Sequence, residues 1–409
     1  MKGKSSVLSS KYIIDGIRYP VSPKEMLDAA KGLEGSSAVE DQDAIADETI
    51  DASPVSDEFS KTEINRYLSG VLADSAKPEV PEGFSEVFTR WTVAKSLIDS
   101  IWCCGKFRLE DLSLNLLWQW NTAGLGQSAA FYQSVSALVE YVDLLGVSIN
   151  DYQFEEGRHC RLLSKAVLST NHPEESEVPV EEPSQTDDPT GKDLEAIGEQ
   201  ISFHSGSCSL WDNTPFKVRK ITKSPRRRCP NQVSGSESSW IIYLPFDTCP
   251  FRLGGSKLCK VTGKHAVLGP EVGDADYFID CYEVIREMVE DGIILAGRTI
   301  SDGGLLPTLR QFIGTDRGMK ADISGVMNAY EEKEMVPVLF GEVPGVLIEI
   351  SDVDYDYVDA EFLLQDVAYY PLGHVSKRMK SITVVSGESG IAGILQSLMS
   401  SQEASEGED

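Results

Sequence analysis

The sequence has no apolar run that approaches the ~20 residues needed to cross a lipid bilayer. Residues 1–20 contain lysines but no apolar stretch behind them, so we expect no signal peptide. Basic charge is also scarce, since 37 Lys and Arg oppose 65 Asp and Glu and give a formal net charge of −28. That balance argues against a general nucleic-acid binder and against a polybasic membrane-surface protein. We therefore expect neither DNA nor a membrane among its partners.

Paired cysteines are lacking as well. The eight cysteines form no Cys-x-x-Cys pair, and their spacings do not repeat. Neither a zinc site nor a disulfide framework is therefore indicated, and we expect reduced thiols in a cytoplasmic protein. The length of 409 residues suggests two or three domains, and the hydrophobic content of 41% predicts that part of the chain stays unpacked.

Composition divides the chain into five parts. Between residues 34 and 57 the chain is rich in Asp, Glu, Ser and Ala and buries too little apolar surface to offset its ordering entropy. A short hairpin at 9–19, with Asp15-Gly16 as its turn, is the local exception. We expect a largely disordered acidic arm at 1–80, a compact helix–strand block at 83–168, an acidic and then basic linker at 169–238, a second compact block at 239–385 and a flexible tail at 386–409.

Apolar spacing predicts the main helices and strands. Helices are expected at 88–103, 128–144 (with Ser128 as its N-cap), 276–290, 305–313 and 358–368. Strands are expected at 112–118, 147–154, 240–244, 293–296 and 345–350, and residues 369–375 lead into an edge strand. Strands and helices alternate in the second block, which favours an α/β fold with mixed α+β layers.

One basic cluster stands out in the linker. Lys217 to Arg228 contains seven basic residues, namely Lys217, Arg219, Lys220, Lys223, Arg226, Arg227 and Arg228. Its simplest interpretation is a solvated loop that balances the acidic linker. The sharper hypothesis is a site for an anion, RNA or a partner.

A four-residue turn is the strongest candidate for a site. Ser301, Asp302, Gly303 and Gly304 lie between a predicted strand and a predicted helix. A helix start presents free N–H groups and the positive end of its dipole, which suits phosphate. Asp302 could cap that helix, and the glycines let the backbone approach a ligand. A plain capped turn explains the same residues.

The order of several motifs resembles phosphoribosylformylglycinamidine (FGAM) synthase, a relative of aminoimidazole ribonucleotide (AIR) synthetase. The motifs follow one another in this order: Arg252-Leu253-Gly254-Gly255-Ser256, then the helix from Tyr277 to Glu290, then Ser301-Asp302-Gly303-Gly304-Leu305-Leu306. Last come Val338-Leu339-Phe340-Gly341-Glu342 and Gly345-Val346-Leu347-Ile348. The match extends backwards to Leu112-Ser113-Leu114-Asn115-Leu116-Leu117-Trp118, to Gly126 with Ala129 to Tyr132, and to Leu145-Gly146-Val147-Ser148-Ile149. The likeness covers about 88–165 and 240–378 and falls in the second synthetase-like unit, so it implies an AIR synthase-related C-terminal domain in the second block.

The resemblance implies an ATP-dependent reaction that turns an amide into an amidine with ammonia from glutamine. It implies ATP or ADP as the ligand of Ser301 to Gly304, and Arg252, Gly254, Gly255 and Ser256 as a phosphate or interface loop. It also implies a homodimer or a partner synthetase subunit.

The motif departs from the family at the metal ligands. The family's metal-binding aspartate corresponds to Thr299, with Arg298 in place of a histidine, and its glutamate and asparagine ligands correspond to Lys95 and Asp99. A lysine does not ligate Mg²⁺ as a carboxylate does. The Gly-Lys-Asp-Ser stretch is replaced by residues 151–155, and no nucleotide subdomain or glutaminase arrangement is recognisable. We therefore expect no catalytic residue and no metal site.

Three hypotheses follow. The first is a degenerate FGAM synthase relative, a pseudoenzyme that serves as a binding or scaffold module. The second is a subunit of a split FGAM synthase that needs a partner chain. The third is an anion- or RNA-binding module that uses Lys217 to Arg228, which the net charge of −28 disfavours.

Overall fold

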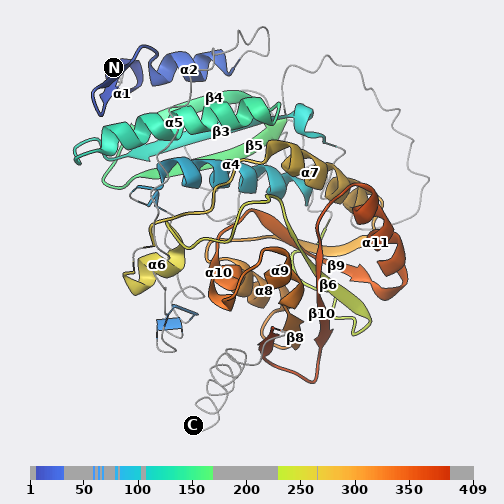
Figure 1. Cartoon of the computed structure of the whole chain (residues 1–409). Coiled ribbons are helices and arrows are strands. Elements are labelled where there is room, and N and C mark those ends of the chain that lie inside the picture. The colour runs from blue at the N-terminus through green and yellow to red at the C-terminus, as the bar shows by residue number, and fades with distance from the viewer. Residues whose placement is uncertain are drawn as a thin grey trace, which may run out of the picture.

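The computed structural model describes residues 6–31, 59, 63–64, 67–68, 79–81, 83–102, 107–168, 229–264 and 266–386. Most of the expected acidic arm beyond residue 31, residues 169–228 of the expected linker with its basic cluster at 217–228, and the tail from residue 387 onward lie outside the described residues. The described residues form a six-stranded, a three-stranded and a two-stranded sheet, and helices pack against the two larger sheets (Figure 1). The expected mixed α/β architecture is confirmed.

The first block is a three-stranded sheet covered by two long helices. Its elements are α4 (Ser85–Ile101), η1 (Leu109–Asp111), β3 (Leu112–Trp120), α5 (Gln127–Leu144), β4 (Ser148–Glu156) and β5 (Arg161–Leu168). The strand order is β4-β3-β5, with β3 parallel to β4 and antiparallel to β5. The predicted apolar face of α4 is confirmed, because Trp91, Ala94, Ile98 and Ile101 are all buried.

The start of α5 differs from the prediction. The helix begins at Gln127, and its N-cap position is Gly126, whose φ of 74° lies in the left-handed region. Ser128 is therefore inside the first turn and is not the N-cap. Glycine adopts this backbone conformation at little steric cost, which explains how the helix starts without a side-chain cap.

The second block contains a six-stranded sheet. Its elements are β6 (Ser239–Pro245), α6 (Lys257–Thr262), α7 (Ala275–Glu290), β7 (Ile294–Thr299), α8 (Leu305–Ile313), β8 (Gly318–Asp322), α9 (Ser324–Ala329), α10 (Met335–Phe340), β9 (Gly345–Ser351), η4 (Asp352–Asp354), α11 (Tyr355–Leu364), β10 (Tyr370–Ser376) and β11 (Ile382–Val385). The strand order is β11-β8-β10-β6-β9-β7.

Residues 369–375 were expected to lead into an edge strand, and most of them form β10, which lies inside the sheet. On one side β10 is antiparallel to β6, and on the other it is antiparallel to β8. β11 then adds to β8 in parallel. Neither β8 nor β11 was predicted at its own position. β8 places β10 in the interior of the sheet, and β11, which follows β10 in the chain, is the edge strand.

The N-terminal residues contain more structure than their composition suggests. β1 (Tyr12–Ile14) and β2 (Ile17–Tyr19) form the predicted hairpin, and Asp15 and Gly16 both have positive φ, as a tight primed turn requires. α1 (Ser6–Ser9) precedes the hairpin, and α2 (Pro23–Ala29) follows with a capping box between Ser22 and Glu25. Outside the predicted hairpin, the expectation of a disordered arm is therefore wrong for α1 and α2.

The two blocks share one hydrophobic core. At the end of α4, Trp102 donates from its indole Nε1 to Thr299 Oγ1 of β7 at 2.9 Å, and the Ser100 and Tyr282 hydroxyls are 2.8 Å apart. The Trp102 ring fills the space above Gly297, where an added Cβ would lie 2.1 Å from it. This close packing fixes α4 against β7. Among the described helices, none has the length and apolarity needed to cross a membrane.

Candidate functional site

The turn between β7 and α8 is held by its two glycines. Gly303 and Gly304 have φ of 101° and 87°, a region that other residues rarely adopt. A Cβ on Gly304 would also lie 2.7 Å from the backbone of Phe340. The Gly-Gly sequence is therefore required by this turn whether or not it binds a ligand.

Asp302 forms an ion pair and does not cap the helix. The N-cap position of α8 is Gly304, and no side chain caps the helix. The Asp302 Oδ1 instead lies 2.6 Å from Nζ of Lys95 on α4, and their side chains are 25% and 9% exposed. The same ammonium lies 4.5 Å from the centre of the Trp91 ring. The predicted cap is thus corrected, because a buried lysine takes the carboxylate.

Glu342 supplies a second carboxylate to the same cluster. Its Oε1 accepts hydrogen bonds from the amides of Gly303 at 2.9 Å and Lys257 at 2.8 Å. Burial, and then the charge of Asp302, raise the pKa of Glu342 to about 7 against the opposing pull of those amides and Lys95. Burial also acts to raise the pKa of Asp302, but Lys95 outweighs it and the net pKa is lowered.

The remaining polar groups of the turn bond within the protein. The Ser301 N–H donates to Thr308 Oγ1 at 2.9 Å, and the two hydroxyl oxygens are also 2.9 Å apart. The Thr308 hydroxyl donates to the Gly304 carbonyl at 2.8 Å. The Tyr67 hydroxyl donates to the Gly303 carbonyl at 2.9 Å. The turn presents its donors mainly to the chain itself.

The positions that the resemblance assigns to metal ligands lie in two contacting pairs, and neither pair has the donor atoms that a metal ion needs. Lys95 contacts Asp302, and the Thr299 hydroxyl donates to Asp99 Oδ1 at 2.5 Å. An ammonium and a threonine hydroxyl replace carboxylates, so the donor set is wrong for Mg²⁺. No group of three or more His, Cys, Asp or Glu side chains suited to a metal occurs among the described residues.

The predicted phosphate or interface loop lies beside this cluster. The Gly254 N–H donates to the Leu268 carbonyl at 2.8 Å, and the Ser256 hydroxyl accepts from the Cys259 amide as the N-cap of α6. Arg252 is exposed. The loop forms one side of a small, shallow pocket of about 20 Å³ that is partly open to solvent. The pocket is lined by Pro81, Phe84, Val87, Phe88, Trp91, Arg252, Gly254, Gly255, Ser256, Pro270 and Glu342.

Sequence reasoning missed two members of the site. Glu342 was noted within a motif, but nothing in the sequence showed that it would reach the Gly303 amide. Tyr67 lies in the segment expected to be disordered, yet it is buried and packs edge-on against Phe340 with ring centres 5.2 Å apart. The available signal was the apolar Phe59, Ile64, Tyr67 and Leu68 within a segment otherwise poor in apolar residues.

Comparison with curated proteins confirms the resemblance to FGAM synthases. A probable FGAM synthase of Arabidopsis thaliana is 22% identical over 293 residues, which is 71% of this chain and 18% of that protein. The Drosophila melanogaster enzyme is 30% identical over 187 residues, or 43% of this chain and 14% of that protein. The Homo sapiens enzyme is 22% identical over 294 residues, or 71% and 18%. The chain thus spans less than a fifth of the length of these relatives.

No family model matches the chain. Among solved structures, Thermotoga maritima PurL complexed with FGAR has a TM-score of 0.48 and 10% identity, and it covers 78% of this chain and 43% of its own. PurLQS from the same organism has a TM-score of 0.45 and 11% identity, with coverage of 74% and 39%. T. maritima PurL complexed with ATP has a TM-score of 0.41 and 10% identity, and it covers 82% of this chain and 42% of its own. The complex with ADP has a TM-score of 0.43 and 9% identity, and it covers 77% of this chain and 42% of its own.

Proposed function

We propose that this chain is a non-catalytic binding or scaffold module of FGAM synthase ancestry, which acts in the cytoplasm. The observation that carries the proposal is the ion pair between Lys95 and Asp302. A side-chain ammonium lies among the positions where the resemblance implies a metal ion. A lysine held by a carboxylate at 2.6 Å neutralises that carboxylate without any bound metal.

The groups that a phosphate would meet at the Ser301 to Gly304 turn support the same proposal. A nucleotide phosphate bound at Ser301 to Gly304 would need the Gly303 amide, which already donates to Glu342. It would also lie beside Glu342, whose carboxylate repels phosphate when it is ionised. We therefore expect ATP or ADP to bind this turn weakly and without Mg²⁺, mainly through Ser301 and backbone N–H groups.

The test is a direct assay of the purified chain with formylglycinamide ribonucleotide, ammonium and Mg-ATP. We expect no amidine product above a blank without protein. Turnover would disprove the proposal.

ATP titrations with and without Mg²⁺ test the site itself. Weak, metal-independent binding that is lost in Ser301→Ala would agree with the proposal. Binding that needs Mg²⁺ and survives Ser301→Ala would contradict it. A matched variant, Lys95→Glu with Thr299→Asp, restores carboxylates beside Asp99 and Asp302. It should gain Mn²⁺ binding that the parent chain lacks, measured by the loss of the free Mn²⁺ paramagnetic signal.

The second candidate is a subunit of a split amidine-forming ligase. It is favoured by the pocket beside the site, whose lining combines exposed Arg252 and Glu342 with the aromatic side chains of Phe84, Phe88 and Trp91. Such a pocket suits a loop of another chain. The two candidates separate in the same assay, because only the split enzyme gains turnover when a partner synthetase chain is added.

A further inference from the structure

Helix α11 carries apolar side chains on two opposite faces. Its inner face is anchored, since Val358 and Phe362 are fully buried and Tyr355 packs on Trp240 with ring centres 5.1 Å apart. Its outer face continues from η4 and exposes Val353 by 89%, Tyr357 by 50% and Leu364 by 76%. These residues, with exposed Ala360, are spaced by three or four positions and form one helical stripe. We name it the α11 stripe.

The α11 stripe is bordered by negative charge. Residues 352–366 contain no Lys, Arg or His but six acidic residues, Asp352, Asp354, Asp356, Asp359, Glu361 and Asp366. The neighbouring helix α7 adds to this border (Figure 1). Glu361, Asp291 and Glu287 all act on the Tyr357 hydroxyl and raise its pKa.

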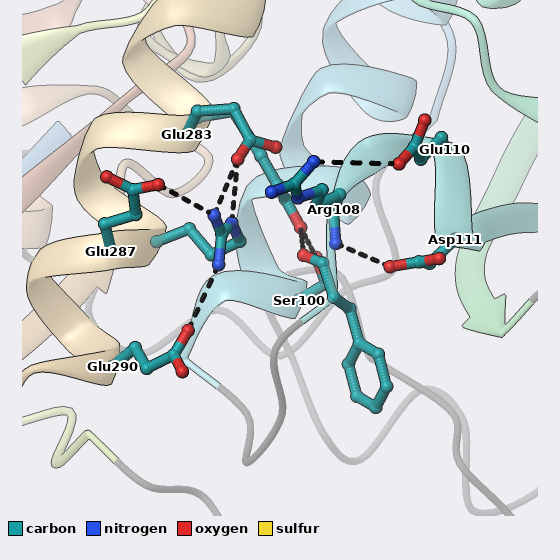
Figure 2. A network of polar contacts seen from close by, with 10 residues as sticks. Ser100, Arg108, Glu110, Asp111, Glu283, Glu287 and Glu290 are labelled. Carbon is teal, nitrogen blue, oxygen red and sulfur yellow. Dashed lines mark hydrogen bonds and ion pairs between the residues drawn. The ribbon is translucent and has the colours of Figure 1, made fainter. Parts of the chain in front are cut away.

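Arg286 is the one basic residue of α7, and it already forms ion pairs within that helix. Glu283, Glu287 and Glu290 converge on the guanidinium of Arg286, at 2.8, 3.2 and 3.2 Å (Figure 2). Of these three carboxylates, Glu287 also acts on the Tyr357 hydroxyl, so the negative charge of α7 reaches the border of the α11 stripe. The border of the stripe is therefore acidic on both helices.

We propose that the α11 stripe is a docking surface for a basic amphipathic helix of a partner protein. An apolar stripe with acidic borders is complementary to a helix that has leucine-like residues on one face and Lys or Arg beside them. A second copy of this chain fits poorly, because it would oppose like charges across the contact. The proposal goes beyond the proposed function, since it concerns a surface other than the turn at Ser301 to Gly304 and its test is independent of nucleotide.

The experiment measures binding of an 18-residue Leu/Lys amphipathic peptide to the full chain by fluorescence anisotropy. A Leu/Glu peptide with the same apolar face and a Leu/Lys peptide of scrambled order are the comparison probes. The test variant is Val353→Asn with Leu364→Asn, which changes exposed residues and leaves the inner face intact. The matched control is Leu125→Asn, because Leu125 is exposed by 101% and lies before α5.

We expect the Leu/Lys peptide to bind with an affinity that drops at least tenfold in the test variant and stays unchanged in the control. Higher salt should weaken the binding, and Asp356→Asn with Glu361→Gln should reduce that salt dependence. Equal binding by parent and test variant would overturn the proposal, as would equal binding of the Leu/Glu or the scrambled peptide. A dimer that is lost in the test variant, seen by sedimentation, would reassign the surface to a second copy. Tighter peptide binding after Arg226→Ser, Arg227→Ser and Arg228→Ser would reassign it to the chain's own basic segment.

Discussion

Replacing Glu342 by glutamine should stabilise the protein at pH 8 and have little effect at pH 5. The substitution keeps the Oε1 atom that accepts from the amides of Gly303 and Lys257, and it removes the charge. Burial, followed by the charge of Asp302, raises the pKa of the Glu342 carboxyl in the folded protein to about 7, from an ordinary value of 4.5. Between pH 4.5 and about pH 7, the folded state therefore holds a proton on Glu342 that the unfolded state has released.

The direction of the pH dependence follows from that proton. Stability falls with rising pH wherever the folded state binds more protons than the unfolded state. Glu342 therefore lowers the free energy of unfolding progressively as pH rises from 4.5 to about 7. At about 1.4 kcal/mol for each pH unit, the full window corresponds to at most about 3 kcal/mol. Asp302 does not interfere, because its lowered pKa confines its own effect to pH values below 3.8.

The assay is urea unfolding of the parent chain and of Glu342→Gln at pH 5 and pH 8, with tryptophan fluorescence as the measured signal. The stability difference between the two proteins should widen by about 2–3 kcal/mol in favour of the variant at the higher pH. Glu334→Gln is the control for loss of one negative charge at an exposed position. A difference that is the same at both pH values would refute the reasoning, and a parent chain that gains relative stability at pH 8 would show that Lys95 and the amides dominate.

Three further predictions concern the packing around the turn, each measured as a change in the free energy of unfolding. Lys95→Met should cost about 3 kcal/mol because it leaves the Asp302 carboxylate without its partner, and adding Asp302→Leu should recover part of that loss; no recovery would argue against coupling of the pair. Gly297→Ala should cost about 1–3 kcal/mol, because the new methyl group meets the Trp102 ring, and a neutral result would mean that α4 can move away from β7. Tyr67→Phe should cost about 1 kcal/mol by removing a hydrogen bond to the turn, whereas no change would show that the bond contributes little.

Local sequence determined much of the framework. The Asp15-Gly16 hairpin was predictable because two adjacent residues tolerate positive φ. The buried face of α7 followed from the spacing of Phe278, Tyr282, Ile285 and Val289, which are all buried. These features depend on residues within one or two turns of each other. The same holds for the position of the Ser301 to Gly304 turn between a strand and a helix.

Contacts between distant residues were decided only by the tertiary structure. The interior position of β10 depends on β8, which comes from an earlier part of the chain and pairs with it. β11 then pairs with the other side of β8. Asp302 had the local features of a helix cap, but Lys95, 207 residues earlier, takes its carboxylate. A buried ammonium requires a close carboxylate, and this need outweighs the modest gain from capping one helix end. Which carboxylate lies near enough to meet it depends on how α4 packs against β7, and nothing in the local sequence around residue 302 contains that information.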